Sequence, residues 1–171
     1  SLSSEDIDLL LEYIRKKGFK TVELTGGEPL TEMDKIIKVI QHAETDSISI
    51  FTSGYFATND LNTERILDLI ASALEERARI GKKPIKLFMR VSVDEFHFRV
   101  SQEKIMRIVK LFEQCHQSKY SGMELRLKGI LTADDPIPSL ASRLKGEIRD
   151  EEKNSPFPFK YITFPSGFAF E

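Results

Sequence analysis

The amino-acid sequence predicts an α/β fold in which mainly parallel strands alternate with helices. Stretches with apolar residues at helical spacing alternate with short, strand-like runs along most of the 171 residues, and the connections between them are short. Such alternation joins neighbouring parallel strands through right-handed helical crossovers. A doubly wound sheet and a full or partial (β/α) barrel both satisfy this pattern, so periodicity alone leaves the two architectures open.

Four stretches carry apolar residues spaced as on one face of a helix. The first follows Ser3 or Ser4, either of which can cap it, and Gly18 is a natural stop. The third is expected to begin at a cap around Asn62 or Thr63. The apolar positions that define the four helices are Ile7, Leu10, Leu11 and Ile14; Met33, Ile36, Ile37 and Ile40; Ile66, Leu67, Ile70, Ala73 and Leu74; and Ile105, Ile108, Val109 and Phe112.

Strand-like runs follow each of these helices. They span residues 21–25, 47–52, 85–93 and 123–131, and they are rich in the apolar and β-branched residues typical of strands. The alternating order would place one more strand before the first helix, just where the sequence begins, and no such run is present. The sequence therefore predicts four consecutive helix–strand units.

The last part of the sequence, residues 133–171, differs in composition. Four prolines flank a charged segment, which predicts loop for most of this stretch. Residues 140–148 are compatible with a short helix, and residues 159–164 return to a strand-like alternation. We expect one domain over residues 1–171, with the helix–strand units in residues 1–132.

Composition restricts the classes of function. The sequence is 40% hydrophobic and 30% charged, as in soluble globular proteins, and no apolar stretch is long enough to span a membrane. A formal net charge of −2 gives no reason to expect nucleic acid as a partner. The single cysteine, Cys115, excludes an internal disulfide framework and agrees with the reducing cytoplasm, where we expect the protein to be located.

The string Gly26-Gly27-Glu28-Pro29 carries the strongest chemical signal. It follows a predicted strand directly, and the carboxyl ends of strands are where parallel α/β folds place binding residues. Two glycines let a ligand approach the backbone, Glu28 adds a carboxylate for an ammonium group, and Pro29 fixes the exit into a helix. A bare Gly-Gly pair in this position is more simply explained by a tight turn.

With its neighbours, this string resembles a motif of the radical S-adenosylmethionine (SAM) superfamily. Residues 22–30 resemble that family's second-strand motif, whose loop receives the amino group of the methionine part of SAM. In family order, residues 51–54 resemble a Thr-Asn-Gly turn, 91–97 resemble a Ser-x-Asp-x-Phe-His string, and 127–130 lie where the fifth strand passes the adenine. The resemblance spans roughly residues 4–132. It implies a partial (β/α) barrel of mainly parallel strands with outer helices.

The resemblance also implies a SAM site at the carboxyl ends of the strands. The Gly-Gly-Glu-Pro loop of the second-strand motif would hold the methionine amine, two serines would reach the carboxylate or ribose hydroxyls, and an apolar residue would cover the adenine. The residues so implied are Gly26, Gly27, Glu28, Pro29, Ser53, Ser92, Asp94 and Ile130. Ser92 is equally well explained as a strand-end hydroxyl bonded to backbone. His97 is a candidate substrate contact or proton donor, and no metal site is expected among Asp94, Glu95 and His97.

The sequence departs from the family at the iron–sulfur cluster. The family's [4Fe-4S] cluster is held by three cysteines in a Cys-x-x-x-Cys-x-x-Cys loop after the first strand, whereas this sequence contains Cys115 alone. One explanation places the loop upstream of Ser1, and the intact SAM motif favours it. The other is a degenerate barrel that has lost redox chemistry.

For a protein that includes the loop, the resemblance implies an oxidoreductase that cleaves SAM reductively. The cluster would generate a 5′-deoxyadenosyl radical, which takes a hydrogen atom from a substrate. Implied partners are a small-molecule or peptide substrate and a reductant such as flavodoxin or ferredoxin. The alternatives are a SAM- or substrate-binding pseudoenzyme and a (β/α) scaffold in which the Gly-Gly-Glu-Pro turn is coincidental. The sequence does not identify the substrate.

Overall fold

The computed structural model describes residues 2–92, 95–120, 122–130, 147–150 and 159–163. Of residues 95–102, 115–118, 128–130, 147–150 and 159–163 it describes the backbone alone. The helices are α1 (Ser4–Lys17), the short 3₁₀ helix η1 (Pro29–Thr31), α2 (Met33–His42), α3 (Asp60–Arg79) and α4 (Glu95–Lys119). The strands are β1 (Thr21–Leu24), β2 (Ser47–Thr52), β3 (Lys86–Ser92), β4 (Met123–Ile130), β5 (Glu147–Asp150) and β6 (Phe159–Thr163).

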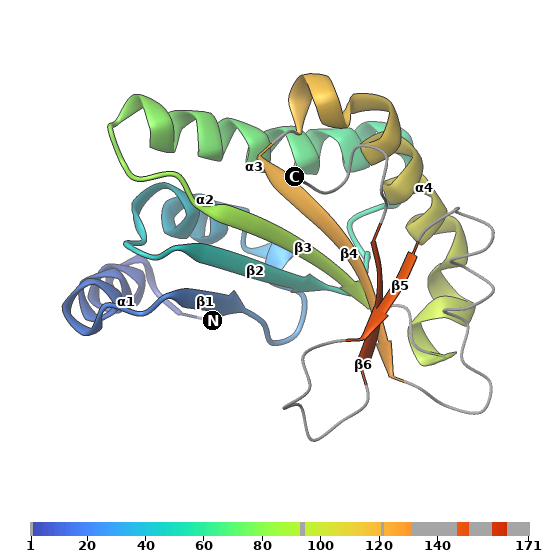
Figure 1. Ribbon diagram of the computed structural model, residues 1–171, viewed down its shortest axis with the longest axis horizontal. Coiled ribbons are helices and arrows are strands. Elements are labelled where there is room, and N and C mark those ends of the chain that lie inside the picture. The colour runs from blue at the N-terminus through green and yellow to red at the C-terminus, as the bar shows by residue number, and fades with distance from the viewer. Residues whose placement is uncertain (1, 93–94, 121, 131–146, 151–158, 164–171) are drawn as a thin grey trace.

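The six strands form one sheet with the order β1-β2-β3-β4-β6-β5. The first four strands are parallel, β6 is antiparallel to β4, and β5 is antiparallel to β6 (Figure 1). Strand β1 lies at one edge of this sheet. The expected α/β fold of mainly parallel strands, each preceded by a helix, is therefore confirmed.

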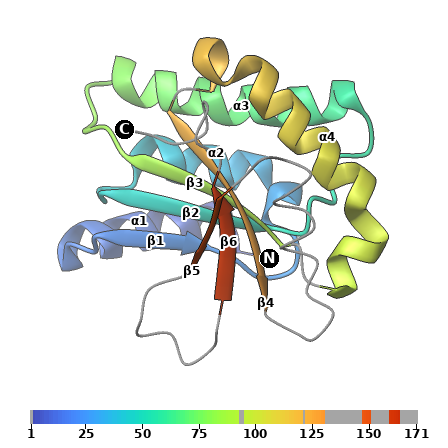
Figure 2. The same cartoon turned by 45° about the vertical axis from the view of Figure 1, so that its right-hand side comes forward.

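The main hydrophobic core lies between the parallel strands and the helices that cover one face of them (Figure 2). Three residues in register across β2, β3 and β4, namely Ile48, Leu87 and Met123, are each no more than 1% exposed. Full burial of one such side chain stabilises the fold by about 1.5–3 kcal/mol. The alternate positions, such as Phe51 and Arg90, face the other side of the sheet and are half-buried. A doubly wound sheet carries helices on both faces. The helices in the described part of the chain cover one face of the parallel strands, which favours the barrel-like alternative.

Side-chain hydrogen bonds cap the first turns of α1 and α3. Ser3 caps α1 in a reciprocal arrangement with Asp6, in which each side chain accepts a hydrogen bond from the other residue's backbone N–H. The cap predicted for α3 around Asn62 or Thr63 is wrong. The Asn59 side chain accepts a hydrogen bond from the Asn62 N–H at 2.8 Å, so the helix starts three residues earlier.

The C-terminal part of the chain joins the same sheet. The strand predicted around residues 159–164 is confirmed as β6, which pairs with β4 through Gly129 and Lys160. The helix expected over residues 140–148 is wrong at its end, because Glu147 and Ile148 belong to β5. Residues 140–146 lie outside the described residues. No helix in the described part of the chain is long and apolar enough to cross a membrane.

Candidate cofactor site

The carboxyl ends of the four parallel strands lie along one edge of the sheet, which we call the rim. The register pairs Leu24 with Ile50, Thr52 with Val91 and Ser92 with Lys128, so the loops that follow β1, β2 and β3 start side by side (Figure 1). The sequence analysis placed the candidate loops at Gly26, Ser53 and Ser92 on one edge of the sheet. The strand register confirms this.

The loop after β1, residues 25–28, exposes its backbone because of its two glycines. Gly26 has φ +96° and Gly27 has φ +33°, in the region that L side chains rarely adopt. A Cβ built at either position would meet no atom within 4 Å, so the space beside this backbone is open. Pro29 then opens the 3₁₀ helix η1, and the Thr31 hydroxyl donates a hydrogen bond to the Glu28 carbonyl at 2.7 Å. This geometry leaves room for a ligand against the glycine backbone.

The Glu28 carboxylate connects this loop to the end of β2. Its Oε1 accepts a hydrogen bond from the Thr52 hydroxyl at 2.6 Å, and its Oε2 accepts hydrogen bonds from the backbone N–H and the hydroxyl of Ser53 at 3.0 and 2.8 Å. Thr52 is only 3% exposed, and its Oγ also accepts a hydrogen bond from the Gly54 N–H at 3.0 Å. We call these contacts the Glu28 bridge.

The bridge brings together two residues that the sequence analysis treated as separate contacts, Glu28 and Ser53. It adds Thr52, which sequence reasoning did not single out. The available signal was a hydroxyl pair, Thr52 and Ser53, at the end of the strand next to the one that precedes Glu28. Parallel neighbours end at the same edge, so these hydroxyls were placed to reach a carboxylate in the adjoining loop.

The remaining candidates stand at the ends of β3 and β4. Ser92 is the last residue of β3 and half-buried, and within the described residues its hydroxyl makes no hydrogen bond to backbone. Asp94 lies outside the described residues. Ile130 ends β4, and His97 belongs to the first turn of α4, which begins at Glu95; their backbone positions alone are described.

Two pockets adjoin the Glu28 bridge. One, of about 570 Å³, lies between α1, the loop of residues 25–28 and α2, with Ile7 and Ile36 among its lining residues. The other, of about 510 Å³, lies toward α3 and includes Tyr55, which is 61% exposed. Glu28 lines both pockets.

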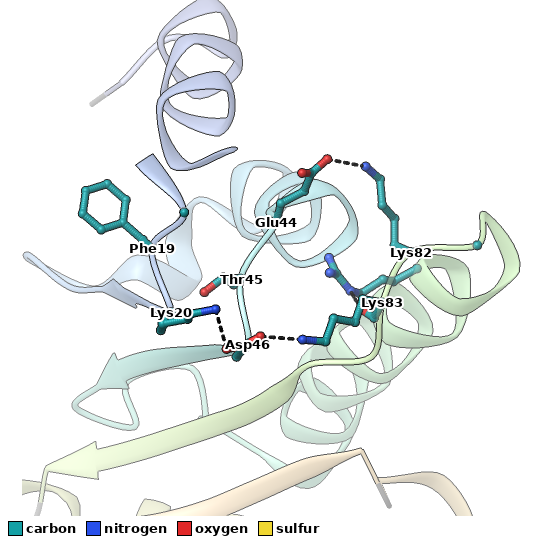
Figure 3. A pocket seen from close by; sticks show the side chains of 10 residues that line it. Phe19, Lys20, Glu44, Thr45, Asp46, Lys82 and Lys83 are labelled. Atoms are coloured by element: carbon teal, nitrogen blue, oxygen red, sulfur yellow. Dashed lines mark hydrogen bonds and ion pairs between the residues drawn. The ribbon is translucent and has the colours of Figure 1, made fainter. Parts of the chain in front are cut away.

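A further pocket, of about 390 Å³, lies at the opposite edge of the sheet, where loops lead from the helices into β1, β2 and β3 (Figure 3). Arg77, only 2% exposed, donates hydrogen bonds from Nε to the Lys83 carbonyl at 2.6 Å and from a terminal nitrogen to the Ile40 and Gln41 carbonyls at 2.9 and 3.3 Å. Burial lowers the pKa of its guanidinium, and the Glu44 carboxylate opposes that shift.

The other charges around this pocket form ion pairs (Figure 3). Lys82 pairs with Glu44 at 3.2 Å, and Lys83 and Lys20 both pair with Asp46, at 2.7 and 3.5 Å. The hydrogen bond from Lys83, followed by the charge of Lys20, lowers the pKa of Asp46. Because α1, α2 and α3 all end here, these cations complement the negative ends of the helix dipoles. The charged side chains around this pocket are explained by their contribution to stability, so the pocket is not a candidate site.

Searches among known proteins give relatives of one kind. No family model matches the chain. It is 25% identical to a probable GTP 3′,8-cyclase of Metallosphaera sedula, with 99% of this chain and 62% of the relative covered. It is 22% and 28% identical to GTP 3′,8-cyclases of Aliarcobacter butzleri and Aquifex aeolicus, with 98% and 84% of this chain and 46% and 42% of the relatives covered. The chain thus spans about half the length of these curated relatives.

The relatives are radical SAM enzymes. The chain is similar to these enzymes over most of its length. The alignments cover nearly the whole chain in two of the three cases, which includes the loop with Gly26 and Gly27 and the end of β3 at Ser92. The resemblance drawn from four short strings is therefore confirmed at the level of the whole core.

Among the described residues, no cysteine lies at the rim. Cys115, the one cysteine of the sequence, is located in the second half of α4. Within the described residues, no group of three or more His, Cys, Asp and Glu side chains is placed to hold a metal ion.

Proposed function

We propose that this chain is the SAM-binding core of a radical SAM enzyme. The observation that supports this most strongly is the open glycine backbone after β1, on the same rim as Ser53 and Ser92. These loops follow one another in the order of the family's SAM-contacting strings. A turn needed only for chain reversal would require neither this order nor neighbouring hydroxyls along one rim.

The rim residues fit SAM by the chemistry of their donors and acceptors. Backbone carbonyls of Gly26 and Gly27 would accept hydrogen bonds from the methionine amine, and no Cβ blocks their approach. The Ser92 hydroxyl would donate to the carboxylate or to a ribose hydroxyl. Asp94, two residues after Ser92 in the sequence, and Ile130, the last residue of β4, are proposed contacts of the ribose and adenine. SAM itself supplies the sulfonium whose reductive cleavage provides a hydrogen-abstracting radical, while the protein binds it and excludes water.

A [4Fe-4S] cluster does not fit the residues of this chain. Cluster irons need several thiolate ligands, and Cys115 provides one. A cluster would therefore need cysteines that this sequence does not contain. We derive no role for any residue of this chain in holding it, and the cluster is proposed for the parent protein alone.

The proposed substrate is a GTP-related small molecule. The three relatives described above are each named for a GTP 3′,8-cyclase activity, which favours a nucleotide over a peptide substrate. A flavodoxin- or ferredoxin-type reductant and a cytoplasmic location remain predictions. A second candidate function is a SAM- or nucleotide-binding pseudoenzyme, which is favoured by the combination of an intact glycine loop with a single cysteine.

Anaerobic reconstitution with iron and sulfide separates these two functions. The complete gene product should gain the broad visible absorbance of a [4Fe-4S] cluster and cleave SAM when reduced. The 171-residue chain alone should gain neither property. If the complete product forms no cluster but binds SAM or GTP, the pseudoenzyme is the correct function. If the 171-residue chain forms a stoichiometric cluster, the argument from the single cysteine fails.

A further inference from the structure

We infer that Glu28 is a positioning residue, which fixes the SAM-binding backbone by attaching it to the end of β2 rather than by contacting the methionine amine. This inference rests on the proposed function of the rim. It differs from the role that the resemblance implied for Glu28, and it withdraws the Ser53 hydroxyl from the set of direct SAM contacts.

The hydrogen bonds of the carboxylate carry the inference. Both oxygens of Glu28 are engaged, Oε1 by the Thr52 hydroxyl and Oε2 by two donors of Ser53. These are charge-assisted hydrogen bonds, which are shorter and roughly twice as strong as neutral ones. An ammonium group approaching this carboxylate would have to compete with three donors already in place. The Ser53 hydroxyl likewise directs its proton at Glu28 and not at a ligand.

The bridge belongs to a larger network that immobilises both loops. The Thr31 hydroxyl holds the Glu28 carbonyl, and the Thr52 oxygen that donates to Glu28 accepts the N–H of Gly54. Thr52 is almost completely buried, so water competes poorly for these bonds. The residue next to Gly27 is therefore fixed at its carbonyl and at its carboxylate.

Fixing Glu28 limits the freedom of the two glycines before it. Glycine has the largest conformational entropy to lose on ordering, and no neighbouring atom lies close enough to where a Cβ would stand at Gly26 or Gly27 to restrain them by packing. A loop that is already ordered before it binds a ligand does not lose that entropy during binding. The bridge should thus increase SAM affinity without touching SAM.

The test compares two residues of the bridge with a matched carboxylate outside it. The complete gene product is first reconstituted anaerobically with iron and sulfide. Its SAM affinity is then measured by calorimetry for Glu28→Gln, Thr52→Val and the double variant. Glu23→Gln is the control, because Glu23 is exposed, lines the same pocket and takes no part in the bridge. Thr52→Ser tests rescue, since it keeps the hydroxyl. Circular dichroism establishes that each variant is folded.

A positioning role predicts that the effects of Glu28→Gln and Thr52→Val do not add. Each should weaken SAM binding about tenfold, as expected for one charge-assisted hydrogen bond, and the double variant should be no weaker than the worse single variant. Thr52→Ser and Glu23→Gln should stay within about twofold of wild type. Thr52 is only 3% exposed, so its replacement should act through Glu28; if Thr52→Val binds SAM as tightly as wild type, the inference is overturned.

A SAM analogue without the amino group distinguishes positioning from direct contact. Under the positioning role, Glu28→Gln weakens SAM and the analogue by the same factor. If the variant loses affinity for SAM but not for the analogue, Glu28 contacts the amine and the inference is wrong.

Hydrogen exchange of the protein without SAM gives a readout that does not depend on the cofactor. The Ser53 amide, which donates to Glu28, should exchange faster in Glu28→Gln than in Glu23→Gln. Equal exchange in the two variants shows that the bridge does not form. If the Ser53 amide exchanges slowly in wild type and faster in Glu28→Gln, the bridge forms. If the wild-type protein nevertheless binds no SAM, the proposed function fails and the positioning role fails with it, while the bridge remains as a structural feature.

Discussion

The two edges of the parallel sheet use charged side chains in different ways. At the edge where the strands begin, Arg77 donates to three backbone carbonyls, and lysines form ion pairs with Glu44 and Asp46. At the rim, Glu28 accepts from three donors of the adjoining loop, and the glycine backbone before it stays open. One edge satisfies backbone groups, whereas the other leaves them available.

The direction of the helices explains this difference. In a helix–strand repeat, helices end at the edge where the strands begin, and the next helices start at the rim. Helix C-termini carry partial negative charge and leave carbonyls unpaired, which suits arginine and lysine. Helix N-termini carry partial positive charge, which suits a carboxylate such as Glu28 and anionic groups of a ligand. The comparison therefore predicts that the first edge supports stability and that the rim supports binding.

The largest expected effect is the loss of stability in Arg77→Met. The change removes a buried guanidinium and leaves three carbonyls without this donor, of Ile40 in a buried and of Gln41 and Lys83 in partly buried contacts, which should lower the free energy of unfolding by about 2–4 kcal/mol. Denaturant titration measures this, with Arg79→Met as the matched control. Arg79 is two residues further along α3, 75% exposed and paired with Glu76, so its replacement should have little effect.

Arg77→Met should leave SAM affinity unchanged at temperatures where the variant is folded. If folded Arg77→Met loses SAM affinity while Arg79→Met behaves as wild type, the assignment of stability to one edge and binding to the other is wrong.

The next effect in size is the loss of SAM binding in Gly27→Val. A β-branched side chain at φ +33° is strained and obstructs approach to the backbone. An acceptor left unpaired costs about 1–3 kcal/mol, roughly ten- to a hundredfold in affinity, and calorimetric titration measures it. Gly18→Val is the control, because Gly18 has φ +66°, equally open surroundings and a place at the opposite edge. Both variants should lose stability, but only Gly27→Val should lose SAM. If folded Gly27→Val binds SAM as tightly as wild type, the loop is only a turn and does not bind SAM.

Local patterns were enough to predict the main elements and the location of the site. The helices follow from apolar spacing such as that of Ile105, Ile108 and Phe112, all fully buried. The rim follows from the rule that parallel strands end together, applied to Gly26 and Ser92. Both inferences depend on residues close in sequence or on a general property of parallel sheets.

What the sequence did not predict depends on contacts between distant residues. Glu28 and Thr52 are 24 positions apart, and no period in the sequence indicates that they form a hydrogen bond. Arg77 does stand on the apolar face of α3, one turn after Ala73. A charged residue on that face indicated a buried side chain that hydrogen-bonds to the backbone. The start of α3 was misplaced because Asn59, Asn62 and Thr63 are all good caps, and only the backbone geometry selects Asn59.

A smaller effect on SAM binding is expected for Ser92→Ala. Ser92 is half-buried at the rim, where water can replace a lost hydroxyl contact, so the variant should lose about 0.5–1 kcal/mol of binding, roughly two- to fivefold. Ser47→Ala is the control. Ser47 begins the neighbouring strand, with its hydroxyl 3.0 Å from that of Thr21. A loss in Ser92→Ala as large as that in Gly27→Val would mean that side chains, and not the glycine backbone, dominate the site.

The smallest effect concerns the pH dependence of stability at the opposite edge. Hydrogen bonding from Lys83 and the charge of Lys20 lower the pKa of the Asp46 carboxyl from its ordinary value of 3.8. A carboxyl whose pKa is lower in the folded state stabilises the protein fully above its unfolded pKa and loses that contribution as the pH falls through its folded pKa. Between about pH 5 and pH 2 the free energy of unfolding of wild type should therefore decrease by more than that of Asp46→Asn, and the difference between the two decreases is the margin contributed by Asp46. Denaturant titrations of both proteins across this range, at low and high salt, measure the margin.

This margin should be small and should shrink further in salt, because Asp46 and both lysines are largely exposed. SAM affinity at neutral pH should be the same in Asp46→Asn and wild type. If the two proteins lose stability in parallel as the pH falls, these ion pairs make no contribution, and Arg77 alone accounts for the stabilising role of this edge. If Asp46→Asn instead weakens SAM binding, the two edges are coupled through β2, and the contrast between them is wrong.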